Sequence, residues 1–267
     1  MGHGNQRQLL PAPCLRQPTC KRVVACAPPR CLPCFSLSTP TPPAPAWTTR
    51  FATLVRRHFL LKAAGICLFM WVFFVLYFHT LREPVVAVFT MPLTALDHAV
   101  PFEPAALWPY ASLWLYVGLP PGLMPSLHAL LRYGIWMAGL CVSGLLIFHF
   151  APTAVPVRLA PAEVAQHPGF AILQGVDAAG NACPSLHVAT AVFSAFWIAH
   201  LMRAIGAPAW TRVLNGAWLL AIVWSTLATY QHVALDAAAG ALLGAAFAWG
   251  ALRWGPTLIE PLSSRRL

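Results

Sequence analysis

The chain has 267 residues, of which 58% are hydrophobic and only 9% charged, and its formal net charge is +10. A soluble domain carries about 25% charged residues, so this composition excludes an ordinary soluble enzyme and indicates a membrane protein with several spans. In such a protein the positions of Lys and Arg set the orientation, so the positive net charge does not by itself imply a nucleic-acid partner.

Residues 1–50 are expected to form a disordered cytoplasmic tail. Five of the eight cysteines lie here among many Pro, Ser and Thr residues, without hydrophobic periodicity. Cys31 and Cys34 form a CxxC pair that could bind zinc or be redox active, but no second CxxC or paired His accompanies it. A translation start assigned too far upstream would produce the same composition. We therefore place the membrane domain at residues 51–258, followed by a short basic tail at 259–267.

Hydrophobic runs predict an all-α, multi-pass bundle of about six transmembrane helices. The expected spans are residues 60–78, 105–119, 133–150, 184–202, 213–230 and 232–254. The run from 85 to 96 is too short to span and contains Pro92, so we expect an interfacial or re-entrant segment there.

Polar and aromatic residues follow this short segment. Asp97 and Glu103 could recognise a sugar or amine head group, but solvated acids of an outer loop are the simpler interpretation. Four aromatic residues further on are interpreted as anchors at the membrane interface rather than as a substrate cage, namely Trp108, Tyr110, Trp114 and Tyr116.

The distribution of Lys and Arg supports this topology. After position 49, Arg82 and Arg158 fall on segments expected outside. Ten others fall on segments expected inside, namely Arg50, Arg56, Arg57, Lys62, Arg132, Arg203, Arg212, Arg253, Arg265 and Arg266. Basic residues accumulate on the cytoplasmic side. We therefore expect both termini inside, in the cytoplasmic membrane of a bacterium.

Two polar motifs stand at the ends of spans on the expected outer face. The first is Asn181-Ala-Cys-Pro-Ser-Leu-His187, and the second runs from Ser225 to His232 and Asp236. An ionisable side chain in a membrane is costly unless it faces a polar cavity, so these residues form a functional hypothesis. The same letters Pro-Ser-Leu-His recur at 125–128, but on the inner face, roughly 30 Å away. We interpret that copy as a helix start.

These side chains suit phosphoryl transfer. His232 and Asp236 are four residues apart and share a helix face, so the carboxylate can fix the tautomer of the ring. The other nitrogen of His232 is then free to attack or to accept a proton, and His187 could supply the complementary acid. One His would attack phosphorus and form a phosphohistidine, while the other protonates the leaving alkoxide. Ser185 lies at a helix start, where backbone N–H groups favour phosphate, and Asn181 could donate a further hydrogen bond.

The two motifs resemble the second and third signatures of the type 2 phosphatidic acid phosphatase superfamily, over roughly residues 60–255. The resemblance implies a metal-independent enzyme of lipid metabolism that uses no cofactor. It implies that His232 is the nucleophile, Asp236 its orienting acid and His187 the general acid. It also implies that Ser185 and the neighbouring backbone bind phosphate.

Two departures from the family pattern favour a phosphodiester substrate. Thr226 stands where the phosphatases have Arg, and their first signature, a Lys followed by Arg-Pro, has no clear match. Arg158 is the nearest basic residue before the second signature and is a candidate phosphate ligand. A dianionic monoester needs such cations most.

The pattern is similar to the inositolphosphotransferase and sphingolipid-synthase branch, so we expect a lipid phosphotransferase with a lipid alcohol as acceptor. The alternative is a lipid phosphate phosphatase acting on phosphatidic acid or isoprenyl pyrophosphate. The sequence does not determine the oligomeric state, and no nucleic-acid partner is expected.

Other classes of protein make different demands. A zinc site built from His187, His232 and Asp236 has acceptable ligand types and would make activity sensitive to chelation. Paired haem ligands at His187 and His200 would require a second helix with matching histidines, which His232 does not provide. A non-catalytic membrane scaffold is the broadest alternative. The Ala and Gly stripe of the last span is typical of tight helix packing on any of these interpretations.

Overall fold

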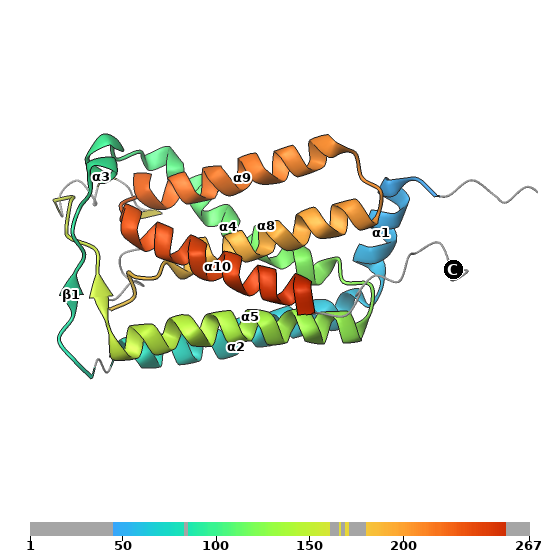
Figure 1. The fold of residues 1–267 in the computed structure, drawn as a ribbon, viewed down its shortest axis with the longest axis horizontal. Coiled ribbons are helices and arrows are strands. Elements are labelled where there is room, and N and C mark those ends of the chain that lie inside the picture. Colours follow the sequence, from blue (N-terminus) through green and yellow to red (C-terminus); the bar gives the residue numbers. More distant parts are fainter. Residues whose placement is uncertain (1–44, 83–84, 161–165, 167–168, 171–179, 255–267) are drawn as a thin grey trace, which may run out of the picture. The chain divides into compact units, whose positions relative to one another are not determined.

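The computed structural model describes residues 45–82, 85–160, 166, 169–170 and 180–254, which are mostly helical (Figure 1). The predicted all-α class is confirmed. The Cys-rich residues 1–44, with their CxxC pair, and the basic tail at 259–267 lie outside the described residues. Helix α1 (Trp47–Arg56) crosses the boundary expected at residue 50.

Six long helices follow the predicted spans closely. They are α2 (Phe59–Arg82), α4 (Leu107–Gly122), α5 (Leu127–Phe150), α8 (Leu186–Ala204), α9 (Ala209–Ala228) and α10 (Ala234–Trp254). By length and composition, four helices of the described chain could cross a membrane: α2, α5, α8 and α10. Helix α4 has only 16 residues, and α9 carries Arg212 and Asn215. A count of six spans therefore stays a prediction.

Helix starts are encoded locally. Ser126 caps α5 by accepting a hydrogen bond from the N–H of Ala129, and Ser185 caps α8 by accepting one from Val188. A Ser at this position satisfies one of the N–H groups that have no partner within the helix. The interpretation of residues 125–128 as a helix start is thus confirmed.

The short segment between α2 and α4, expected to be interfacial or re-entrant, is largely extended and contains a short strand. Strand β1 (Phe89–Thr90) pairs in parallel with β2 (Thr153–Ala154), which follows α5. Pro92 cannot donate a helical hydrogen bond. Earlier in the segment, the β-branched neighbours Val85 and Val86 also disfavour helix. Helix α3 (Ala95–Ala99) and the 3-10 turn η1 (Pro104–Ala106) then lead into α4. These pieces lie where α2, α5 and α9 end and α10 begins (Figure 1).

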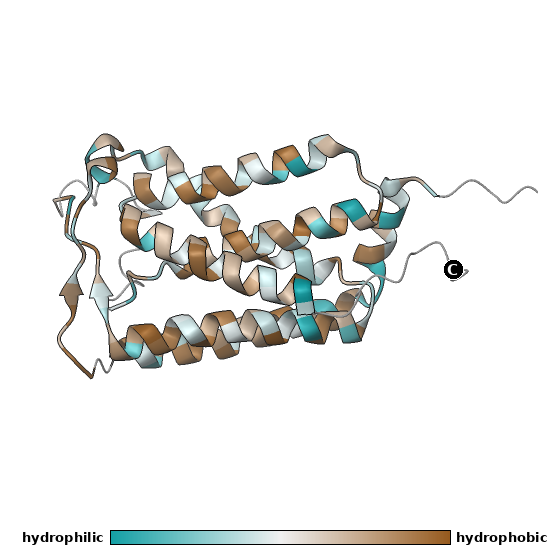
Figure 2. Cartoon of the chain, viewed as in Figure 1, coloured by the Kyte–Doolittle hydropathy of each residue, from teal (hydrophilic) through white to brown (hydrophobic). Residues whose placement is uncertain are grey.

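Helix α8 is the centre of the bundle and packs against α10, α9, α4 and α5. Two thirds of its span is buried, at 67%, whereas only 6% of the span in α2 is buried. Figure 2 shows hydrophobic residues along most of the length of α2 and α5. A helix that is apolar on its exposed faces is suited to contact with lipid.

Helices α8 and α10 approach so closely that two glycines of α10 leave no room for a side chain. A Cβ added at Gly240 would lie 2.3 Å from the carbonyl oxygen of Ser185, and one at Gly244 would lie 2.2 Å from that of Ala189. The predicted tight packing of this stripe is confirmed.

Gly244→Ala is expected to lower the free energy of unfolding by roughly 1–3 kcal/mol, because the new methyl group pushes α10 away from α8. Thermal unfolding in detergent measures this change. The control is Gly216→Ala on α9, where nothing lies within 4 Å of the added Cβ. Equal melting temperatures for the two variants would contradict the prediction.

Candidate active site

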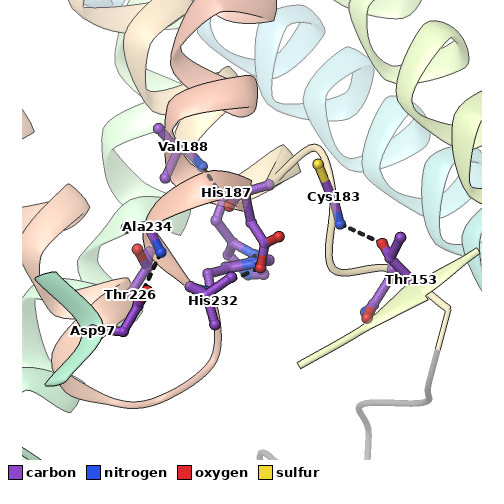
Figure 3. Close-up of polar contacts among 12 residues, drawn as sticks. Asp97, Thr153, Cys183, His187, Val188, Thr226, His232 and Ala234 are labelled. Carbon is purple, nitrogen blue, oxygen red and sulfur yellow. Dashed lines mark hydrogen bonds and ion pairs between the residues drawn. The ribbon is translucent and has the colours of Figure 1, made fainter. Parts of the chain in front are cut away.

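Two stretches of the chain bring two histidines and an aspartate together. His187 lies in the first turn of α8, His232 in the turn between α9 and α10, and Asp236 in the first turn of α10. Nδ1 of His187 is 3.2 Å from Nε2 of His232 (Figure 3). Nδ1 of His232 is 3.7 Å from Oδ2 of Asp236. The structure thus places the predicted nucleophile between the predicted acid and the predicted orienting carboxylate.

The His232–Asp236 pair is deeply buried. Asp236 is 0% exposed and His232 is 4% exposed. Oδ2 of Asp236 accepts a hydrogen bond from the N–H of Val233 at 3.0 Å. Nδ1 of His232 and Oδ1 of Asp236 have no hydrogen-bond partner among the described residues. The 3.7 Å between Nδ1 of His232 and Oδ2 of Asp236 exceeds a hydrogen bond, but a shift of well under 1 Å would form one.

The end of α9 aims His232 at the site. The N–H of Gln231 donates to the carbonyl of Thr226, and the N–H of Tyr230 donates to that of Leu227. Tyr230 has φ 56°, so α9 ends in a Schellman motif with Tyr230 in the left-handed position. The N–H of His232 also donates to the carbonyl of Thr226, at 3.0 Å. Thr226 therefore fixes this turn through its backbone, while its side chain bonds back to α9.

The predicted phosphate ligands Ser185 and Asn181 hold the start of α8. Ser185 is fully buried, and its N–H donates to the carbonyl of Asp236 at 3.0 Å, which joins α8 to α10. The side-chain amide of Asn181 donates to the hydroxyl of Tyr77 on α2. The phosphate-binding roles expected for Ser185 and Asn181 stay predictions.

Thr153 of β2 anchors the segment before α8. Its carbonyl accepts from the N–H of Ala182, and its hydroxyl accepts from the N–H of Cys183 at 2.7 Å (Figure 3). Burial, together with the nearby charge of Asp236, raises the pKa of the Cys183 thiol. Cys183 therefore stays a neutral thiol beside the site.

Arg158 packs against the turn that precedes His232. Its guanidinium carbon lies 3.5 Å from the centre of the Tyr230 ring, and Nη2 donates to the carbonyl of Asp97 at 2.6 Å. A cation over an aromatic face is held by the ring quadrupole. The phosphate-binding role expected for Arg158 stays a prediction.

Asp97 is not the solvated acid that the sequence suggested, because it is only 1% exposed. Its Oδ1 accepts from the N–H of Ala234, the first residue of α10, at 2.8 Å. Its Oδ2 accepts from the N–H and the hydroxyl of Thr94, both at 2.7 Å. Asp97 therefore satisfies an N–H group at the start of α10 that has no partner within the helix. Glu103 and His98 are exposed, as expected of a polar surface.

The contacts of Asp97 change its pKa. Burial alone raises the pKa of this carboxyl, but the hydrogen bonds from Thr94 and Ala234 and the charge of Arg158 bring it below its ordinary value. The ionised form is thus favoured in the folded protein. Its contribution to stability is complete above the unfolded pKa of about 3.9 and is lost as the pH falls through the folded pKa.

Asp97→Ala is expected to lower the free energy of unfolding by roughly 2–4 kcal/mol at neutral pH, because buried donors lose their acceptor. Thermal unfolding at pH 7 and below about pH 4 measures this loss, which should shrink in acid. The control is Glu103→Ala, which removes an exposed acid that accepts one hydrogen bond from Ala105. A loss of equal size at both pH values would contradict the prediction.

Tyr110 is a site residue that sequence reasoning missed. It was interpreted as an interface anchor, but it is only 4% exposed and its hydroxyl lies 2.8 Å from Nε2 of His187. Tyr116 is also buried and bonds to the side chain of Asn215, whereas Trp108, at 82% exposed, fits the expected anchor. Hydropathy could not separate these residues, because α4 is apolar on all sides and has no polar face.

An apolar cavity of about 610 Å³ adjoins the two histidines and is lined mainly by α2, α4 and α5. Its wall on α2 runs from Gly65 to Tyr77, a length of about 18 Å at the helical rise per residue. Asn181, Gln231 and the two histidines line it at the end where α8 begins. No Lys, Arg, Asp or Glu is among the described residues that line it. Such a cavity fits an apolar chain whose polar group reaches the histidines.

No group of three or more His, Cys, Asp and Glu side chains within the described ranges is arranged to hold a metal ion. The zinc site considered from the sequence therefore has no geometric support in that part of the chain.

The sequence matches the PAP2 superfamily over residues 103–260, more than half of the chain, and the chain belongs to that superfamily. Membership, together with the apolar helices, defines its class, a membrane phosphatase or phosphotransferase for lipid-type substrates. The matched region contains His187, His232 and Asp236. No curated protein and no solved structure matches the chain. The resemblance to the superfamily is confirmed, and the inositolphosphotransferase-like branch stays a prediction.

Proposed function

We propose that the protein is a lipid phosphotransferase, which moves a phospho-head group from one lipid to the hydroxyl of another through a phosphohistidine on His232. The contact between His187 and His232, 3.2 Å apart at one end of an apolar cavity, carries this proposal. The cavity would hold the lipid chain and present the phosphate to both rings.

The reaction has two half-reactions. Nε2 of His232 attacks phosphorus, and the N–P bond forms while the P–O bond to the leaving lipid alcohol breaks. Protonated His187 gives its Nδ1 proton to the leaving oxygen, and Asp236 stabilises the positive charge on the His232 ring. An acceptor hydroxyl then returns a proton to His187 and attacks phosphorus, which breaks the N–P bond. Because the two rings are in direct contact in the structure, they must separate to admit the phosphoryl group.

The charges around the site favour a phosphodiester over a monoester. The described lining of the cavity carries no Lys or Arg, and the guanidinium of Arg158 is engaged with Tyr230 and Asp97. Thr226 stands where the phosphatases of the family have Arg. It is buried, and its hydroxyl donates to the carbonyl of Val223. A singly charged diester needs less cationic compensation than a dianionic monoester.

We also place the site at the extracytoplasmic face. Basic residues stand at the ends of the helices that lie away from the site. They are Arg56 at the end of α1, Arg132 in the second turn of α5, and Arg203 and Arg253 in the last turns of α8 and α10. Cytoplasmic ends of spans collect such residues.

The test incubates the purified full chain with labelled phosphatidylinositol, phosphatidic acid or isoprenyl pyrophosphate, with and without ceramide or diacylglycerol. Appearance of the labelled head group on the acceptor is the expected result. Release of free phosphate alone, with no transfer, would replace the transferase by a lipid phosphate phosphatase, in which water takes the place of the acceptor. Turnover of none of these lipids by a folded preparation would contradict both reactions.

A further inference from the structure

Helix α4 holds the ring of His187 through Tyr110. The hydroxyl of Tyr110 lies 2.8 Å from Nε2 of His187, and the two rings are tilted by 33° with their centres 4.9 Å apart. Trp114, one turn further along α4, meets the same imidazole edge-on with its centre 6.1 Å away. The ring is therefore oriented by two aromatic side chains of one helix.

The contacts form a chain of polar groups from Tyr110 through His187 and His232 to Asp236. Nδ1 of His232 faces the carboxylate of Asp236, so this nitrogen carries the proton and Nε2 is an acceptor. One of the two nitrogens in the contact between the rings must donate, so Nδ1 of His187 carries a proton. Nε2 of neutral His187 then has none, and it accepts from the Tyr110 hydroxyl.

We propose that Tyr110 is a positioning residue for His187, which keeps Nδ1 directed at the oxygen of the leaving lipid alcohol. This inference rests on the proposed function. A phenol can donate to an unprotonated Nε2 and accept from a protonated one. The Tyr110 contact can therefore persist when His187 gains a proton, and the ring need not turn between the neutral and protonated forms.

The test is Tyr110→Phe, assayed on a lipid phosphodiester and on a nitrophenyl phosphodiester whose leaving group needs little protonation. The turnover number on the lipid is expected to fall about 10- to 100-fold, because a misaimed acid loses much of its effect. The KM should change little, and turnover of the nitrophenyl ester should fall far less. The ratio of the two activities does not depend on how much of the preparation is folded.

Tyr116→Phe is the matched control, because Tyr116 is a buried tyrosine of the same helix whose hydroxyl bonds to Asn215 rather than to the site. It should leave the activity ratio unchanged. In a His187→Ala background, Tyr110→Phe should cause no further loss on the lipid, since its effect acts through His187.

An unchanged activity ratio in Tyr110→Phe, or a further loss in the His187→Ala background, would overturn the role of Tyr110. His232→Ala separates this failure from failure of the proposed function. If His232→Ala is inactive while Tyr110→Phe keeps the normal ratio, only the inference about Tyr110 falls.

Discussion

His232→Ala is expected to reduce head-group transfer by at least about 10⁴-fold, because the proposed mechanism loses the nucleophile that forms its covalent intermediate. The imidazole is buried, contacts His187 through Nε2 and faces Asp236 through Nδ1. Water in the resulting space cannot reproduce a nucleophile held at this position. Transfer of label from phosphatidylinositol to ceramide measures the loss.

The chain contains a matched control for this experiment. His128 ends a second Pro-Ser-Leu-His sequence and is exposed at the start of α5, at the far end of the bundle from His187. His128→Ala should leave turnover within about twofold of the wild type, as expected for a surface substitution. Comparable activity of the two variants would mean that His232 is not the nucleophile.

Asp236→Asn is expected to reduce turnover by about 10³-fold or more, because the amide no longer fixes the tautomer of His232 or stabilises its positive charge. The amide oxygen can still accept from the N–H of Val233, and the Ser185 contact uses the backbone of Asp236. The loss should therefore fall on chemistry more than on folding. Turnover and melting temperature of the same preparation distinguish the two.

Asp97→Asn provides the comparison for Asp236→Asn. Asp97 of α3 is also buried and contacts the start of α10. Its carboxylate accepts hydrogen bonds from backbone and hydroxyl groups, and it does not face a histidine as Asp236 does. We expect Asp97→Asn to lower the melting temperature and to keep most of the turnover at low temperature. A folded Asp236→Asn protein with more than about a tenth of wild-type turnover would contradict the role of Asp236.

Local features of the sequence account for the fold and for half of the site. Apolar runs predicted the long helices to within a few residues at most ends, and the two Pro-Ser-Leu-His sequences predicted the starts of α5 and α8, where Ser126 and Ser185 cap the helices. His232 and Asp236 lie close together, as their spacing predicted, but His232 stands in the turn before α10 rather than on a shared helix face. The distribution of Arg and Lys supported a topology in which the helix ends that carry His187 and His232 lie on the same side of the membrane.

The remaining parts of the site depend on contacts between distant residues. Tyr110 meets His187 across 77 positions, and Asp97 meets Ala234 across 137. Helices α4 and α8 have no marked polar face, so nothing in their sequences shows which side of α4 turns toward His187. The angle and rotation with which α4 packs against α8 select Tyr110 over Trp108, and that choice leaves no trace in local periodicity.

The most direct test is to trap the intermediate. The full chain is mixed with a lipid carrying a ³²P-labelled head group, quenched in base, in which phosphohistidine survives, and cleaved into peptides. The account predicts label on the peptide that contains His232, and none in Asp236→Asn or His232→Ala protein. Label on a different residue, or turnover with no labelled peptide at any time point, would contradict it.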